Sequence, residues 1–132
     1  MKNKEQELIA EAKKAIKFAY APYSKFKVGC ALLTKNGRIF TGCNIENASY
    51  GLTVCAERVA LFKAISEGES ELEKLVIYTP TNEFTYPCGA CRQTLAEFNP
   101  NLEVILINKQ NKLAQLKLSS LLPKPFTKEA LK

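Results

Sequence analysis

Three cysteines in two short segments place the strongest constraint on how this chain can fold. Cys55 is followed by Ala56 and Glu57, and further along the chain Pro87-Cys88-Gly89-Ala90-Cys91 supplies the only C-x-x-C of the sequence. Thiolates are soft ligands that zinc accepts in tetrahedral geometry, and three of them leave the fourth position open, as in catalytic zinc sites. The fold must therefore bring both segments to one point, where we expect one zinc ion per chain.

The composition is typical of one soluble globular domain. The chain has 132 residues, of which 46% are hydrophobic and 24% are charged, and a chain of this size can bury a core without staples. No apolar run approaches the roughly 18 to 20 residues of a membrane span, and the N-terminal residues do not resemble a secretory signal. We expect a single domain over residues 1–132, located in the cytoplasm and without membrane contact.

The chain contains five cysteines and no histidine. An odd number of cysteines without an export signal favours metal binding or catalysis over disulfides. Metal ligands must then come from Cys, Asp or Glu, and His-based catalytic triads are excluded.

The net charge of +6 arises mainly from lysines that are scattered along the chain. Because clustering rather than net charge marks a nucleic-acid footprint, we favour a solvated surface and expect no nucleic-acid partner. Arginine is rare, yet Arg58 and Arg92 both lie beside proposed zinc ligands. Zn²⁺ with three thiolates carries a net negative charge and is a poor Lewis acid. We therefore expect Arg58, with Gln93 as a second candidate, to donate hydrogen bonds to the thiolates and restore the acidity of bound water.

The hydrophobic pattern predicts helices alternating with strands. Helices are expected over residues 4–20, 54–67 (capped by Thr53 and closed by Gly68) and 88–98, with one helical turn at 119–122. Strands are expected over residues 26–34, 38–46, 74–79, 103–108 and 112–118, the last at a sheet edge. This order predicts an α/β fold, a three-layer α/β/α sandwich around a mixed sheet of about five strands.

Asn36-Gly37 is a strong signal for a two-residue hairpin between the first two strands. Ideal pairing around such a turn places Cys30 opposite Cys43. We interpret the two as small buried hydrophobes rather than as a disulfide or a redox sensor.

Glu57 is the candidate proton carrier. The expected helices place Cys55, Cys88 and Cys91 in first turns, where the positive end of the helix dipole favours thiolate. Glu57 is then near enough to hydrogen-bond a zinc-bound water, and without histidine it is the best-placed group for general acid–base catalysis. The alternative for Glu57 is a purely structural interaction with the helix dipole.

The alternative for the whole site is a structural Cys₄ zinc in a non-catalytic domain, with Cys30 or Cys43 as the fourth ligand. Structural cysteines usually come as two close-spaced pairs, and this chain has only one such pair. The pattern therefore favours a catalytic site.

These residues resemble the zinc-dependent nucleoside and nucleobase deaminases, and most closely the small homotetrameric cytidine deaminases. The resemblance covers nearly the whole chain: Cys55-Ala56-Glu57, Pro87-Cys88-Gly89-Ala90-Cys91, residues 21–26 and 42–51, and Leu121-Leu122-Pro123 with Phe126. It implies a homotetramer that hydrolyses cytidine and deoxycytidine to uridine and deoxyuridine in pyrimidine salvage. Zinc-activated water would attack C4 of cytosine while Glu57 protonates N3 and passes a proton to the departing ammonia.

The resemblance also implies substrate-binding residues. Asn44 and Glu46 would hold the ribose hydroxyls, as alternate strand positions on one face allow. Phe26 would stack on or near the base, the backbone near Ala56 and Cys88 would read its polar edge, and Tyr50 and Phe126 would act across a subunit interface.

Three features depart from this pattern. Tyr86 precedes Pro87 where a small residue is expected, and Cys30 stands where alanine is common. The predicted hairpin register also places Phe26 and Asn44 on opposite faces of the sheet, so either a bulge near Gly29 or Gly42 or fraying at the strand ends is expected to bring them together.

Two other reactions remain open. The substrate could be another cytosine-containing small molecule, such as a nucleoside antibiotic, although the Asn44-x-Glu46 pair favours a ribose. Polynucleotide editing is disfavoured by the short chain and the dispersed lysines.

Overall fold

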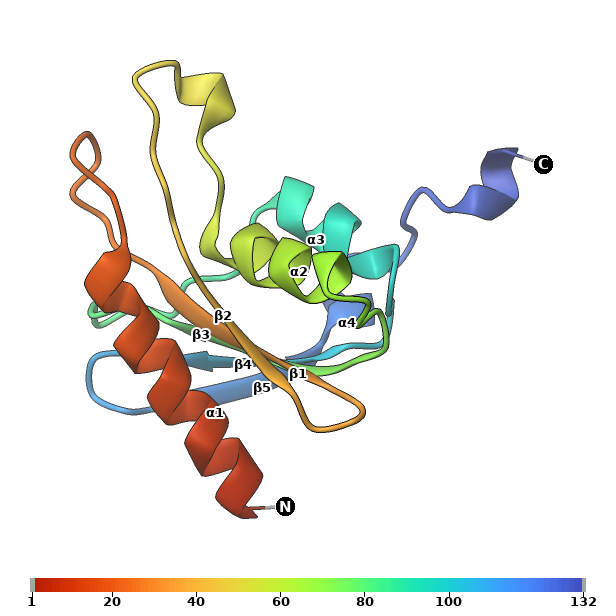
Figure 1. Ribbon diagram of the computed structural model, residues 1–132, viewed down its shortest axis with the longest axis horizontal. Coiled ribbons are helices and arrows are strands. Elements are labelled where there is room, and N and C mark those ends of the chain that lie inside the picture. The colour runs from red at the N-terminus through yellow and green to blue at the C-terminus, as the bar shows by residue number, and fades with distance from the viewer. Residues whose placement is uncertain (1, 132) are drawn as a thin grey trace.

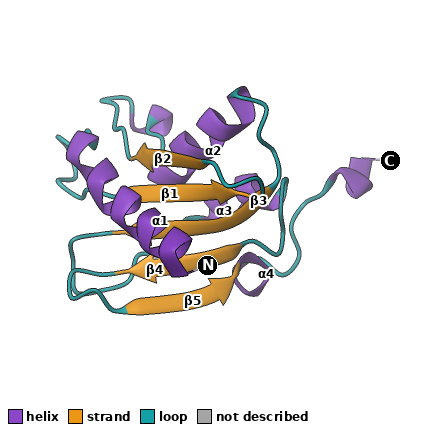
Figure 2. Cartoon of the chain, turned by 60° about the horizontal axis from the view of Figure 1, so that its bottom comes forward, coloured by secondary structure: helices purple, strands orange, loops and turns teal. Residues whose placement is uncertain are grey.

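Five strands form one mixed sheet in the computed structural model, which describes residues 2–131. The spatial order is β2-β1-β3-β4-β5, with β3 and β4 parallel and the other neighbours antiparallel. Figure 1 and Figure 2 show α1 on one face of the sheet and α2 and α3 on the other. The predicted three-layer α/β/α sandwich is therefore confirmed. The strands are β1 (Gly29–Thr34), β2 (Ile39–Cys43), β3 (Leu72–Tyr78), β4 (Glu103–Ile107) and β5 (Leu113–Lys117).

The helices agree with the predicted ones in order and differ at their ends. They are α1 (Lys2–Ala15), α2 (Ala56–Ser66), α3 (Gly89–Ala96) and the single turn α4 (Leu118–Leu121), with 3₁₀ turns η1 (Ile16–Phe18), η2 (Tyr50–Leu52) and η3 (Lys128–Leu131). The prediction that Thr53 caps α2 is wrong. Cys55 occupies the N-cap position, and the Thr53 hydroxyl instead accepts a hydrogen bond from the backbone N–H of Asn47 at 3.1 Å. No helix within residues 2–131 is long and apolar enough to span a bilayer.

The β1–β2 hairpin has a three-residue loop rather than the predicted two-residue loop. The Thr34 N–H donates to the Arg38 carbonyl at 2.9 Å, and Gly37 adopts a φ of 92°, as in the common three-residue loop with glycine in the left-handed region. The extra residue shifts the register by one position, so Cys30 lies opposite Gly42 and not opposite Cys43. All five cysteines are free thiols, so Cys30 and Cys43 form no disulfide. Cys30 is buried as expected, whereas Cys43 at the end of the outer strand β2 is only half-buried.

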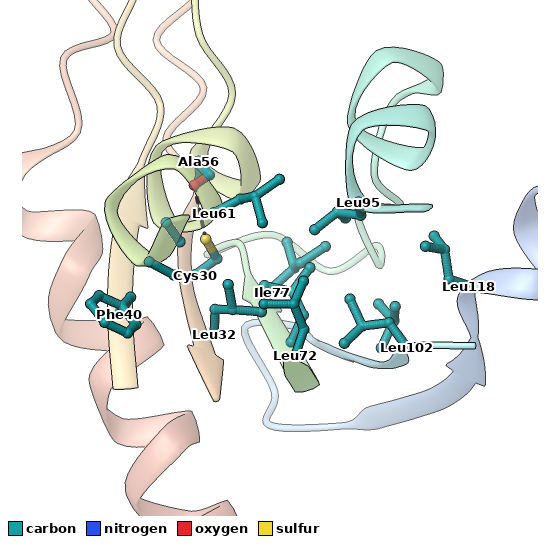
Figure 3. Close-up of a cluster of buried hydrophobic side chains, with 14 of the residues drawn as sticks. Cys30, Leu32, Phe40, Ala56, Leu61, Leu72, Ile77, Leu95, Leu102 and Leu118 are labelled. Carbon is teal, nitrogen blue, oxygen red and sulfur yellow. Dashed lines mark hydrogen bonds between the residues drawn. The ribbon is translucent and has the colours of Figure 1, made fainter. Parts of the chain in front are cut away.

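The sheet carries a hydrophobic core on each face because β1, β3 and β4 are central strands whose side chains are buried on both sides. Alternate positions of β1 separate the two cores. Cys30 and Leu32 point toward α2 and α3 (Figure 3), and Ala31 and Leu33 point toward α1. In β5 exposed residues alternate with half-buried ones, as predicted for an edge strand.

Candidate active site

The starts of α2 and α3 meet and bring three sulfur atoms together. Cys55 is the N-cap residue of α2, Cys88 is the N-cap residue of α3, and Cys91 lies in the first turn of α3. The Cys55 and Cys88 sulfurs are 3.7 Å apart, and those of Cys88 and Cys91 are 3.5 Å apart. Cys30 and Cys43 do not join this cluster, and residues 2–131 contain no other cluster of three His, Cys, Asp or Glu side chains with this geometry. The structural Cys₄ alternative is therefore not supported.

The spacing of the three sulfurs fits zinc. Tetrahedral zinc with Zn–S bonds of about 2.3 Å places its sulfur ligands about 3.8 Å apart, close to the two distances found. All three donor atoms lie within 4.8 Å of one another. Three soft donors around one point leave a fourth direction for water or substrate.

Hydrogen bonds within the cluster favour a negatively charged sulfur, which suits the binding of a cation. Hydrogen bonding from the Cys91 thiol, with further hydrogen bonds from Arg58 and Cys88, lowers the pKa of Cys55 to about 5. The same hydrogen bond to Cys55, together with burial, raises the pKa of Cys91. The surroundings of the cluster therefore favour the thiolate form of Cys55, and the protons of the neighbouring thiols are the ones that a metal would displace.

Arg58 lies where it can reach the sulfurs, and Gln93 does not. An Nη2–H of Arg58 donates to the Cys55 sulfur at 3.6 Å. The side-chain amide of Gln93 instead pairs with the backbone of Phe126, donating to its carbonyl at 2.7 Å and accepting from its N–H at 3.1 Å. Arg92 donates to the carbonyls of Pro87 and Leu121, so it fixes the start of α3 rather than the charge of the cluster.

Glu57 is the buried carboxyl of the site. Its side chain is 4% exposed at the first turn of α2, two residues after Cys55. Burial and, to a smaller extent, the Cys55 charge raise the pKa of Glu57, a backbone hydrogen bond and the Arg58 charge oppose them, and the net pKa is about 7. A carboxyl group with this pKa can accept and release a proton near neutral pH, which is what a general acid–base requires.

A cavity of about 250 Å³ opens onto this carboxyl and the sulfurs. The hairpin contributes one wall, and the starts of α2 and α3 contribute the other. The lining includes the sequence candidates Phe26, Asn44, Glu46, Ala56 and Glu57 together with the cysteines Cys55 and Cys88. The structure thus brings both ends of residues 44–58 to one pocket.

The one-residue register shift explains why Phe26 and Asn44 reach the same cavity. Directly opposite residues of an antiparallel pair share a face, and the observed register continues so that Asn44 accepts from the Val28 N–H with Oδ1 at 2.9 Å. Its Nδ2 donates to the Phe26 carbonyl at 2.7 Å. The expected bulge near Gly29 or Gly42 is absent, because the extra residue sits in the turn.

Glu46 is held by the chain segment before β1. Its Oε1 accepts from the N–H groups of Tyr23 and Ser24 at 3.0 and 3.1 Å, and the Ser24 hydroxyl donates to Oε2. These hydrogen bonds, the hydroxyl first, hold the pKa of Glu46 below its usual range. Glu46 is therefore an oriented carboxylate in the lining of the cavity.

Tyr50 and Phe126 do not line this cavity. Tyr50 is 75% exposed in η2, where its ring contacts the ring of Tyr23 edge-on, and Phe126 is 62% exposed in the C-terminal segment. Figure 1 shows both segments projecting from the body of the sheet and its helices. Within one chain, neither ring is part of the pocket.

The cavity also contains polar side chains that the sequence did not predict to be site residues. Ser24, Thr53 and Thr85 all line it. Thr85 belongs to a hydroxyl network, because it donates to the Thr79 hydroxyl at 3.1 Å just after β3. Isolated threonines in loops carry no periodic signal, so only the folded chain shows that they face a pocket.

Three thiols with the spacing of zinc ligands lie beside a buried carboxyl group and a cavity. On an α/β/α sandwich, these features define a zinc-dependent enzyme. The family described as "Cytidine and deoxycytidylate deaminase zinc-binding region" matches residues 2–107. The chain belongs to this family.

Individual relatives support the same assignment. The chain is 49% identical over 127 residues to the cytidine deaminase of Sporosarcina psychrophila, covering 96% of this chain and 93% of the relative. It is 51% identical over 125 residues to that of Halalkalibacterium halodurans, covering 94% and 95%. The crystal structure of cytidine deaminase from Burkholderia pseudomallei superposes with a TM-score of 0.88 at 48% identity, covering 92% of this chain and 98% of that one. The resemblance seen in the sequence and the predicted fold class are both confirmed.

Proposed function

We propose that the chain catalyses the hydrolytic deamination of cytidine and deoxycytidine to uridine and deoxyuridine, with water consumed and ammonia released. The observation that carries this proposal is the single cavity whose lining includes Glu57, Cys55 and Cys88 of the zinc cluster together with Asn44 and Glu46. We assign its Glu57 end to the base and its Glu46 end to the sugar. The reaction belongs to pyrimidine salvage in the cytoplasm, where the free thiols stay reduced.

The base end divides its work among a few groups. Zinc bound by Cys55, Cys88 and Cys91 would supply the Lewis acidity that activates water for attack on C4 of cytosine. Glu57 takes the proton released by that water, delivers it to N3 and then carries a proton to the departing amino group. Its burial and its pKa of about 7 suit both directions of transfer.

The sugar end selects a free nucleoside. Glu46 is already oriented by three hydrogen bonds from Tyr23 and Ser24, and its remaining lone pairs can accept from ribose hydroxyls. The Asn44 amide beside it has one further N–H to offer, because only one is used by Phe26. A fixed carboxylate at this end repels a phosphate, which disfavours nucleotides and polynucleotides as substrates. Phe26 offers its ring to the base from the hairpin wall.

The active unit is a homotetramer in this proposal. Several large apolar side chains near β2 and the exposed side of α2 lie open to solvent within one chain, including Phe18, Ile45, Leu52 and Phe62. Exposed apolar surface of this kind is typical of a subunit interface. Tyr50 and Phe126, which miss the pocket of their own chain, would then complete the pocket of a neighbouring subunit.

The test is to follow the loss of the ultraviolet band of cytidine with zinc-loaded protein. Cytidine and deoxycytidine should be consumed, while deoxycytidylate and a cytosine-containing oligonucleotide should react far more slowly. Absence of cytidine turnover by the zinc-loaded tetramer would refute the proposal. Comparable rates on the oligonucleotide would instead favour polynucleotide editing.

A further inference from the structure

A directly opposite pair of hairpin residues lies beneath the first turn of α2. Cys30 of β1 and Gly42 of β2 are Cα partners in the sheet, and both face the helix. The Cys30 thiol donates to the Ala56 carbonyl at 3.0 Å, and both residues are fully buried. Figure 3 shows this hydrogen bond at the top of the core beneath α2.

Gly42 lets the helix lie directly on the backbone of β2. A Cβ atom at position 42 would lie 2.2 Å from the Ala56 carbonyl oxygen and 2.7 Å from the Ala60 nitrogen. Both atoms belong to the helix backbone, so no flexible side chain could move aside. Any residue other than glycine must therefore push the first turn of α2 away from the sheet.

We propose that Cys30 and Gly42 are positioning residues that form a seat for the Ala56 carbonyl and so fix the depth of the active-site helix. Ala56 lies between Cys55 and Glu57, and the seat places these two side chains relative to the α3 cysteines across the cavity. The two residues act through the helix and touch neither substrate nor metal. The part of the inference that concerns turnover rests on the proposed deamination, and the part that concerns metal binding stands without it.

The thiol at position 30 suits this role because it keeps its proton. Burial raises the pKa of Cys30, and the nearby Glu57 charge raises it further. The group is therefore a neutral S–H donor small enough to sit under a helix. Serine preserves a donor at this position, whereas alanine removes it.

The opposite face of the hairpin offers a matched control. A Cβ at Gly29 would lie 2.3 Å from the Ala12 carbonyl oxygen and 2.9 Å from the Ile16 nitrogen. This close approach is of the same kind as the one at Gly42. However, Gly29 packs against α1, and α1 contributes no residue to the zinc cluster or to the cavity. Gly29→Ala should cost stability without altering the site.

The experiment compares Gly42→Ala with Gly29→Ala in four measurements. These are the thermal midpoint, the thiolate-to-metal absorption of the Co²⁺-substituted protein, the rate of metal loss to a chelator, and kcat and KM for cytidine. Both variants should lose thermal stability. Only Gly42→Ala should change the cobalt spectrum, lose metal faster to a chelator and lose about 100-fold in kcat at nearly unchanged KM, since a displacement of about 1 Å can cost that much.

Milder variants keep the inference testable if Gly42→Ala fails to fold. Cys30→Ala should lower kcat several-fold and speed metal loss, and Cys30→Ser should restore both toward the native values. The proposal is overturned if Gly42→Ala changes metal binding no more than Gly29→Ala does, or, where Gly42→Ala does not fold, if Cys30→Ala leaves metal loss unchanged. A native protein that fails to deaminate cytidine would refute the proposed function alone, because the cobalt spectrum and metal loss still report the seat.

Discussion

The two faces of the hairpin use the same packing solution with different chemical results. At one level of the sheet, the last turn of α1 approaches Gly29 on one face and the first turn of α2 approaches Gly42 on the other. A cysteine lies near each helix end. Burial raises the pKa of Cys43, which lies near the end of α1, whereas hydrogen bonding from Cys91 and Arg58 lowers the pKa of Cys55 at the start of α2 to about 5.

The difference lies in what converges on each thiol. At Cys43 burial outweighs the opposing charge of Lys63, whereas the start of α2 presents N–H groups, which favour a thiolate at Cys55. At α2 a second helix start adds Cys88 and Cys91, and Arg58 adds a positive charge. Close packing of a helix on the sheet is thus common to both faces. A thiol with a lowered pKa is found only on the α2 face, where hydrogen-bond donors and a positive charge surround Cys55.

Glu57→Gln should have the largest effect, and it tests whether catalysis depends on the α2 face of the hairpin. Glutamine keeps the shape of the side chain but cannot carry a proton, so we expect kcat for cytidine to fall by about 10²- to 10⁴-fold. Zinc content, measured by atomic absorption, should stay at the native level. Glu11→Gln on α1 is the control and should leave kcat unchanged. Near-native turnover by Glu57→Gln would mean that another group carries the proton.

Leu8→Ala and Leu61→Ala test whether the α1 face is purely structural. Both leucines are fully buried, one in the core under α1 and one in the core under α2. Each truncation should lower the free energy of unfolding by about 2–5 kcal/mol, measured by urea denaturation. Only Leu61→Ala should also speed the loss of zinc to a chelator. Equal effects on zinc retention would show that the two faces are coupled more tightly than the packing suggests.

The sequence predicted the elements and the zinc cluster because both depend on local pattern. Hydrophobic period and glycine placement located the five strands and the long helices, and the Cys55 and C-x-x-C spacing located the metal ligands at two helix starts. Helix ends were less accurate. Thr53 was predicted to cap α2, and only the fold shows that Cys55 is the N-cap residue and that the Thr53 hydroxyl accepts from the Asn47 N–H instead.

The hairpin register could not be predicted, because Asn36-Gly37 is compatible with two loop lengths. One residue more in the loop moves every side chain of β2 relative to β1. The predicted two-residue loop places Phe26 and Asn44 on opposite faces of the sheet. With the observed loop they lie together, and Gly42 rather than Cys43 lies opposite Cys30. The placement of Gln93 on the Phe126 backbone also depends on the path of the C-terminal segment, which no local pattern determines.

Arg58→Ala should move the pH dependence of turnover without removing the metal. The guanidinium of Arg58 donates to the Cys55 sulfur. Loss of this group leaves more negative charge on the sulfurs, so the water bound by the zinc becomes harder to deprotonate. The acid limb of the kcat profile should therefore move to higher pH by about one unit, equivalent to about 1.4 kcal/mol. Zinc content is measured in parallel and should be retained. Arg38→Ala, which removes ion pairs to Glu67 and Glu69 far from the sulfurs, should leave the profile in place. An unmoved profile in Arg58→Ala would refute the role assigned to this arginine.

Ser24→Ala should have the smallest effect and extends the comparison to Glu46, where hydrogen-bond donors again gather on one group. The Ser24 hydroxyl is the main cause of the lowered pKa of Glu46. Because the folded-state pKa lies below the unfolded one, this carboxylate contributes stability above pH 4.5 that is lost as the pH falls through the folded-state value. Removing the hydroxyl should make the decline of the thermal midpoint below pH 4.5 shallower and lower the midpoint slightly at neutral pH.

Ser66→Ala is the matched control, because the Ser66 hydroxyl donates only to the Lys63 carbonyl. This variant should leave the slope unchanged. A native slope in Ser24→Ala would show that the two backbone N–H groups of Tyr23 and Ser24 suffice to hold Glu46, and that its orientation does not depend on the serine hydroxyl.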